Sequence, residues 1–281
     1  MRFVTFKQGR QIFWGVLEEG GIYYSAKLMS VFPTLHSVIE NYDSINFFQE
    51  INQYISRNEV EILAPFRPKK NIMCIGKNYR EHALEMTGND ESQIPLDPVI
   101  FTKSPSAVIG PNDEIDAHEM ETNQLDYEGE LAVIIGKEGK NISRENAHDY
   151  IFGYTILNDL TARDLQKKHQ QFFRGKSLDT FAPFGPAIVT KDQIRDDQNL
   201  NLKTYVNDEL RQQSNTSHMI FSIGELIETL SDGMTLEPGD VIATGTPSGV
   251  GKGFNPPKFL QVNDRIRIEI ENIGVLENTV S

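Results

Sequence analysis

The sequence lacks several features that mark common classes of protein. Its 281 residues include one cysteine, Cys74, which excludes an internal disulfide. The thiol lies in the apolar segment 72–75, where a buried and unreactive side chain is expected. No apolar run approaches the roughly 18 residues that cross a membrane, and the first residues lack the apolar core of a signal peptide. We therefore expect a cytoplasmic protein without a membrane partner.

Positive charge is also scarce. The chain has 27 Lys and Arg residues against 40 Asp and Glu residues, which gives a net charge of -13. Such a charge argues against nucleic acid or an anionic membrane as the main partner. A small anionic substrate is compatible with it, because a metal ion or a few cationic side chains can reverse the sign inside a pocket.

The first 65 residues are expected to form a small N-terminal α/β domain. Strands are predicted over Arg2–Phe6, Gln11–Leu17 and Gly21–Ala26, and apolar residues at helical spacing predict a helix over 44–56. Two prolines and three cations follow within residues 65–70. This composition places a domain boundary near residue 65 and assigns residues 66–281 to a second, larger domain.

The larger domain is rich in short strands and poor in helices. Strands are predicted over Asn71–Ile75, Val99–Lys103, Glu130–Ile135, Ile151–Leu157, Ala187–Thr190, Lys203–Val206, Asp240–Thr244 and Arg265–Ile270. Helices are predicted over His82–Met86, Thr161–Gln171 and Ile223–Ser231, the second with Thr161 as its N-cap. Many strands with few crossover helices favour an α+β, β-rich sandwich or roll over a doubly wound sheet.

Two glutamates stand directly before an apolar strand. Glu128 and Glu130 are two residues apart, so their side chains point to the same face of the strand that continues to residue 135. Like charges there resist burial unless a cation compensates them. Asp159, after the predicted strand 151–157, could complete an oxygen ligand set suited to Mg²⁺ or Mn²⁺. The alternative is an edge strand whose glutamates face water.

A histidine and a glutamate follow the strand predicted over 71–75. His82 and Glu85 are three residues apart, which places them on one face of a helical turn. A carboxylate beside an imidazole fixes its tautomer and raises its basicity, as a general base requires. The alternative is an ordinary surface pair on a short helix.

Three further polar residues follow Asp159. Arg163 and Gln166 lie one turn along the predicted helix, so both can face the same point as Asp159. Lys176 stands in a Gly-Lys-Ser context but lacks the upstream glycine of a phosphate loop, which argues against a nucleotide role. It suits contact with a carboxylate or enolate oxygen. The alternative is a surface lysine.

A glycine-rich loop follows the strand predicted over 240–244. Residues 244–251 contain three glycines with Thr244 and Thr246. Backbone N–H groups and hydroxyls in such a loop can converge on anionic oxygens. The alternative is a tight turn that needs glycine for its backbone angles.

Taken together and in this order, these segments resemble the fumarylacetoacetate hydrolase family. The resemblance covers about residues 70–275 and rests on segments 76–85, 126–131, 158–166, 175–177 and 244–251. It implies a mixed β-sandwich roll, the shorter bacterial type with a small N-terminal domain, and a homodimer. It assigns the metal to Glu128, Glu130 and Asp159. It also implies that three residues are catalytic: His82, Glu85 and Lys176. The substrate-binding residues that it implies are Arg163, Gln166 and Thr246. The segment 86–97 resembles the family's mobile lid.

The reaction is left open among several that the resemblance implies. Our first expectation is an Mg²⁺- or Mn²⁺-dependent enzyme that cleaves the C3–C4 bond of small anionic oxo acids through a metal-bound pyruvate enolate, as an oxaloacetate decarboxylase does. The alternatives are hydrolysis of an acylpyruvate or fumarylpyruvate and isomerisation of a keto acid. A non-enzymatic interaction protein that retains a relic site is the alternative of another class.

Overall fold

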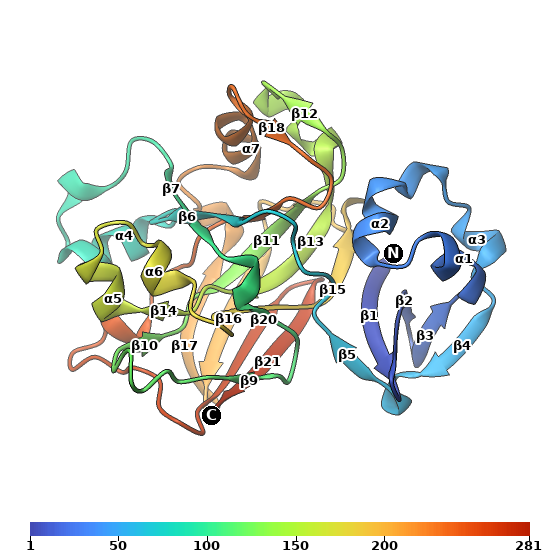
Figure 1. The fold of residues 1–281 in the computed structure, drawn as a ribbon. Coiled ribbons are helices and arrows are strands. Elements are labelled where there is room, and N and C mark those ends of the chain that lie inside the picture. The colour runs from blue at the N-terminus through green and yellow to red at the C-terminus, as the bar shows by residue number, and fades with distance from the viewer.

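A computed structural model describes the backbone of residues 1–281 and every side chain except that of Phe48. It is built mainly from strands, in two larger sheets and two short strand pairs. Figure 1 shows the N-terminal strands and helices at one side of the molecule and helices α4, α5 and α6 at the other. The β-rich α+β architecture predicted from the sequence is confirmed. Among the described residues, no helix is long and apolar enough to cross a membrane.

The largest sheet joins the N-terminal part of the chain to the rest. Its strand order is β4-β3-β2-β1-β15-β13-β11-β19-β6-β7, with β5 beside β1 and β8 beside β15. The N-terminal strands are β1 (Arg2–Gln8), β2 (Gln11–Glu18), β3 (Gly21–Tyr24), β4 (Gln53–Ser56) and β5 (Glu61–Leu63). The others are β6 (Ile72–Gly76), β7 (Val99–Lys103), β8 (Val108–Ile109), β11 (Gly129–Ile135), β13 (Ile151–Asn158), β15 (Ala182–Thr190) and β19 (Val241–Ala243). Since β1 pairs with β15, the domain boundary near residue 65 stays a prediction.

The second sheet lies against the middle of the first. It has the order β17-β16-β20-β21-β9. Its strands are β9 (Glu114–Ile115), β16 (Asn201–Val206), β17 (Glu209–Asn215), β20 (Arg265–Ile270) and β21 (Gly274–Val280). Strands β16, β20 and β21 contact β11, β13 and β15, and apolar side chains from both sheets share one core. Two short pairs complete the strands: β10 (Leu125–Asp126) with β14 (Thr161–Ala162), and β12 (Gly139–Lys140) with β18 (Thr235–Leu236).

The helices are short and lie around the sheets. They are α1 (Ala26–Val31), α2 (Leu35–Glu40), α3 (Phe47–Glu50), α4 (Arg80–Thr87), α5 (Arg163–Lys168), α6 (Phe173–Lys176) and α7 (Ile223–Ser231). Helix α7 begins with a capping box, in which Ser222 and Glu225 each bond the other's backbone N–H. Its five buried residues explain why sequence periodicity located it correctly.

Two local predictions are wrong. The helix predicted over 44–56 is limited to α3, and residues 53–56 form strand β4 because they pair with β3 at the sheet edge. Thr161 is not an N-cap: it lies in β14 opposite Asp126, and its hydroxyl donates to the Asp159 carbonyl. Helix α5 starts two residues later and has no side-chain cap. In both places pairing with a strand distant in sequence overrode a local signal.

The pairing of β11 with β13 positions the site. Gly129 lies opposite Asn158, the last residue of β13. Glu128 and Glu130, on either side of Gly129, therefore lie beside the end of β13, which leads directly into Asp159. Both strands are buried along their whole length, so the carboxylates at this end are supported by a packed apolar layer. The backbone N–H of Asp159 also donates to the Glu128 carbonyl, at 2.8 Å.

Candidate active site

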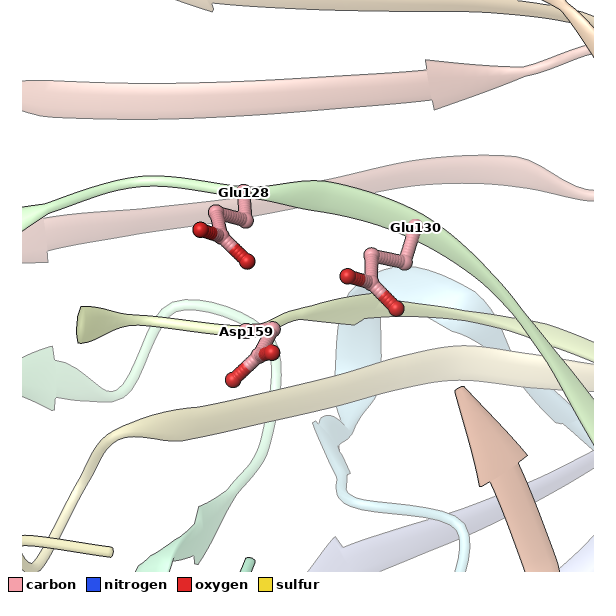
Figure 2. Close-up of side chains that lie close together, drawn as sticks. All are labelled: Glu128, Glu130 and Asp159. Atoms are coloured by element: carbon pink, nitrogen blue, oxygen red, sulfur yellow. The ribbon is translucent and has the colours of Figure 1, made fainter. Parts of the chain in front are cut away.

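Three carboxylates converge where β11 begins and β13 ends. One oxygen from each of Glu128, Glu130 and Asp159 lies within 4.8 Å of the others. Figure 2 shows the two glutamates extending from one strand toward the aspartate that follows its neighbour. Their exposed fractions are 5%, 1% and 0%. The solvated edge strand that the sequence left open is therefore wrong.

Two of these carboxylates are held by buried cations. Lys176 Nζ donates to Glu128 Oε2 and to Asp159 Oδ2, at 2.7 Å each. Arg163 Nη1 lies 2.6 Å from Glu128 Oε1, and Lys103 Nζ lies 2.7 Å from Asp159 Oδ1. Burial opposes the charged form of Glu128, yet Lys176 and Arg163 outweigh it and lower the pKa of this carboxyl.

Glu130 has no such cationic partner among the described side chains. Its Oε2 accepts the Gly245 N–H at 2.9 Å. Burial, and then the nearby Asp159 and Glu128 charges, raise the pKa of Glu130 well above its ordinary value. For Glu130 to be ionised in this buried position, a further positive charge must lie nearby. Three hard oxygen donors with one of them uncompensated fit Mg²⁺ or Mn²⁺, which prefer carboxylate ligands.

His82 and Glu85 form a hydrogen-bonded pair on helix α4. His82 Nδ1 and Glu85 Oε2 are 3.0 Å apart, and both side chains are largely buried. The other oxygen, Glu85 Oε1, accepts the Gly249 N–H at 2.9 Å. An ionised Glu85 can accept only a donor at Nδ1, which leaves Nε2 as the basic atom of a neutral imidazole. The surface pair that the sequence left open is therefore wrong.

Arg163 is fixed by a buried aspartate beside the carboxylate cluster. Its Nε donates to Asp126 Oδ2 at 2.8 Å, and its Nη1 lies 3.4 Å from Gln166 Oε1. Arg163 Nη2 is buried and has no hydrogen-bond partner among the described atoms. Because an unpaired guanidinium N–H is unfavourable when buried, this donor is suited to an incoming anionic oxygen.

The glycine-rich loop holds these parts together. Asp126 accepts the N–H groups of Gly251 and Lys252, and a Cβ atom at Gly253 would overlap the Glu85 carboxylate. The Thr246 hydroxyl donates to the Gly129 carbonyl at 3.0 Å and accepts from Gln212, so it is already bonded on both sides. Only glycine at 253 lets the loop approach helix α4 this closely.

A cavity of about 260 Å³ opens above the cluster. Seven of the residues predicted from the sequence line it: His82, Glu128, Glu130, Arg163, Gln166, Lys176 and Thr246. Glu85 and Asp159 contact these lining residues without lining the cavity themselves. The structure thus brings together all nine predicted residues, while the roles assigned to them stay proposals.

Three buried residues that support this site were not predicted. Asp126 anchors Arg163 and the glycine-rich loop, Lys103 neutralises Asp159, and Gln212 bonds the Gly129 N–H, Thr246 and Pro247. A lysine at the end of the apolar strand predicted over 99–103 was a usable signal for Lys103. Gln212 lies in a polar strand, and nothing in its local sequence marks it.

The segment that resembles a lid runs from helix α4 to strand β7. Gly88 ends α4 in a left-handed conformation, and a short turn follows at Glu91–Gln93. Arg80 and Glu91 pair at 2.7 Å, with both side chains largely exposed. A surface pair of this kind is weak, typically below about 1 kcal/mol, so it adds little to the anchoring of the segment after α4.

We predict that this segment closes when the chelating end of a keto acid is bound. Oxalate with Mg²⁺ is expected to slow hydrogen exchange across residues 81–97, because closure buries backbone amides. Exchange in the distant strands β16 and β20 is the internal reference. Equal exchange rates with and without oxalate would show a fixed element in place of a lid.

Comparison with known proteins supports the family resemblance found in the sequence. The fumarylacetoacetate (FAA) hydrolase C-terminal family model matches residues 71–281. Oxaloacetate tautomerase YisK of Bacillus subtilis is 61% identical over 226 residues, which are 80% of this chain and 74% of that protein.

Solved structures of related proteins match this chain over its whole length. A fumarylacetoacetate hydrolase from Exiguobacterium antarcticum is 45% identical with a TM-score of 0.89, over 100% of this chain and 99% of that one. A maleylpyruvate hydrolase from Sphingobium sp. SYK-6, solved with manganese(II) and pyruvate, is 31% identical with a TM-score of 0.80, over 100% and 98%. This similarity includes the N-terminal part that the family model does not match.

Proposed function

The chain belongs to the fumarylacetoacetate hydrolase family, and from that premise we propose that it is a divalent-metal enzyme that interconverts the enol and keto forms of oxaloacetate. One observation carries the proposal: a carboxylate cluster of metal-binding type and a His–Glu pair meet at one small cavity. The 61% identical relative is named for this reaction, which moves our preference from decarboxylation to tautomerisation.

Glu128, Glu130 and Asp159 would hold the metal. A hard divalent ion there supplies positive charge that stabilises the enolate form of a 2-oxo acid. A solved family relative contains manganese, and the donor set of this chain suits magnesium equally well. Lys176 and Lys103 form ion pairs that hold the Glu128 and Asp159 carboxylates in place, so two of the three ligands would be positioned before an ion binds.

His82 would move the proton at C3. Tautomerisation exchanges a proton on the C2 oxygen for one on C3, so it requires a base and acid above the carbon. In the keto-to-enol direction, neutral Nε2, with Nδ1–H bonded to Glu85, can take a proton from C3 while the C2 oxygen takes one from water, and Glu85 stabilises the imidazolium that forms. In the enol-to-keto direction, the imidazolium gives its proton to C3 and the C2 hydroxyl proton leaves to water. Because the other oxygen of Glu85 accepts the Gly249 N–H, the carboxylate that orients the imidazole is itself held in place.

Arg163 and Lys176 would bind and orient the substrate. The unpaired Nη2 of Arg163 can donate to the C1 carboxylate, and Gln166 lies within reach of the same guanidinium. Lys176 faces the cavity and can donate to the C2 oxygen. Thr246 would contribute its backbone and methyl group, since its hydroxyl is already bonded.

Cleavage of the C3–C4 bond is the second candidate. The same stabilised enolate is the leaving fragment in decarboxylation of oxaloacetate and in hydrolysis of an acylpyruvate. The manganese and pyruvate complex of a maleylpyruvate hydrolase relative favours this alternative. We further propose a cytoplasmic homodimer, as the family resemblance implied. The relic-site alternative is disfavoured by the intact cluster.

A turnover panel tests the proposal. Purified protein with Mg²⁺ or Mn²⁺ is given oxaloacetate, acetylpyruvate, fumarylpyruvate and a hydroxymuconate-type diacid. We expect the enol absorbance of oxaloacetate to relax faster than in buffer with metal alone, without matching release of carbon dioxide. Faster carbon dioxide release would assign a decarboxylase, and cleavage of the acylpyruvates alone would assign a hydrolase.

A further inference from the structure

The mouth of the active-site cavity carries a second group of cations. Lys77, Lys167 and Lys252 line the cavity beside the deeper Arg163 and Lys176. The deeper two are paired with buried carboxylates. In contrast, none of the three lysines at the mouth has an ion-pair partner among the described side chains. We call these three residues the rim lysines.

The rim lysines come from three separate elements. Lys77 follows β6, Lys167 lies on α5, and Lys252 lies in the turn Gly251–Gly253. The Lys252 N–H is bonded to Asp126, which also holds Arg163, so one buried carboxylate fixes the rim next to the deeper arginine. Convergence of distant segments on one opening indicates a built feature of the cavity, since local sequence alone does not place them together.

The buried Asp126 and Glu128 charges act on Lys252, but neither carboxylate forms an ion pair with a rim lysine. Partial burial, then the nearby Arg163 charge, and then Lys167 lower the pKa of Lys252, and together they outweigh Asp126 and Glu128, which raise it. Arg163 and Lys167 therefore lie close enough to Lys252 to repel its positive charge. The chain as a whole has a net charge of -13, so this local group of unpaired lysines differs in sign from the protein overall. A bound anion at the mouth would relieve the repulsion.

We infer that the rim lysines form a subsite for the distal carboxylate of a dicarboxylic 2-oxo acid. The inference rests on the proposed function, in which the 2-oxo acid end lies at the carboxylate cluster. The tail of a four-carbon diacid then points toward the mouth, where Lys167 and Lys252 can donate charge-assisted hydrogen bonds. The subsite selects diacids such as oxaloacetate over monoacids such as acetylpyruvate.

The test removes the two more exposed rim lysines and compares two ligands. Lys167→Ala/Lys252→Ala is measured against Lys168→Ala, a lysine on the same helix that does not line the cavity. Oxalate presents only the chelating end. 3,3-Difluorooxaloacetate adds the distal carboxylate and cannot enolise, because fluorine replaces both C3 hydrogens. Binding of each ligand with Mg²⁺ is measured by titration calorimetry, and KM and kcat are measured with oxaloacetate.

The double variant is expected to bind the difluoro diacid about 10- to 100-fold more weakly, the range for losing hydrogen bonds to a charged group. Oxalate affinity is expected to change less than about threefold, and KM to rise with little change in kcat. Lys168→Ala is expected to behave as the wild type. Equal losses for both ligands, or no loss for either, would overturn the subsite. A wild type that binds the diacid through these lysines but does not tautomerise oxaloacetate would overturn the proposed function and leave the subsite standing.

Discussion

Glu130→Gln is expected to abolish turnover and metal binding while leaving the metal-free protein folded. Among the three clustered carboxylates, Glu130 is the one without a cationic partner in the described structure, so its replacement leaves every buried ion pair intact. The glutamine Oε1 can still accept the Gly245 N–H.

Asp159→Asn is a poorer test, because it would leave Lys103 and Lys176 with an uncompensated buried charge, which typically costs about 3–5 kcal/mol.

The same substitution is expected to stabilise the metal-free protein, and more so at higher pH. Because the folded-state pKa of Glu130 is raised above the ordinary value of 4.5, its contribution to stability is present below that value. The contribution is lost as the pH rises toward the raised pKa, where the buried carboxyl ionises. The glutamine variant lacks this loss. Its advantage over the wild type in unfolding free energy is therefore expected to grow between about pH 5 and about pH 8.

Three measurements examine this prediction. Metal content and oxaloacetate turnover are measured for the variant and for Glu277→Gln, a glutamate of strand β21 away from the cavity. Urea unfolding in EDTA is compared at the two pH values. EDTA is expected to inactivate the wild type reversibly. Full activity of the wild type in EDTA, or of Glu130→Gln with metal, would remove the metal from the proposed mechanism.

His82→Ala is expected to lower tautomerisation by about 10²–10⁴-fold, the usual contribution of a positioned general acid and base. The loss is expected mainly in kcat, because His82 acts on the C3 proton and Arg163 supplies the ground-state contact. Metal affinity is expected to be nearly unchanged, since the ligands are the three carboxylates. Removal of the imidazole leaves Glu85 bonded to Gly249, so helix α4 keeps its contact with the glycine-rich loop.

The same variant separates the candidate reactions. Hydrolysis of an acylpyruvate needs an activated water and is expected to fall as steeply as tautomerisation. Decarboxylation of oxaloacetate breaks its bond without that water, so it is expected to fall less. His218→Ala, which replaces an exposed histidine outside this cavity, is the control. Equal losses on all substrates would assign the His82–Glu85 pair to closure of the segment 81–97 or to substrate orientation.

Local sequence was sufficient for the strands with apolar runs and for the residue types of the site, but it missed strands β17 and β21, which alternate buried and exposed residues or are largely polar. The strands with long apolar runs were found because burial on both faces leaves a signal that needs no partner. The site residues were found by their positions relative to the predicted elements. Glu128 and Glu130 begin an apolar strand, and Asp159 follows one. Two pairs lie at helical spacing, His82 with Glu85 and Arg163 with Gln166, and glycine-containing segments carry Lys176 and Thr246. The family resemblance then supplied roles that spacing alone could not distinguish from a surface pair or a simple turn.

Tertiary structure decided which charges meet. Lys103 and Asp159 are far apart in the sequence, as are Gln212 and Thr246. No local sequence pattern indicates that the side chains of either pair are in contact. The predicted helix over 44–56 failed for the same reason: Ile55 pairs with Ile22 and enters the N-terminal core as part of a strand. Burial of Glu130 without a cation is likewise a property of the packed sheets. Propensity and periodicity act within a few residues, whereas compensation of buried charge depends on which elements the fold brings together.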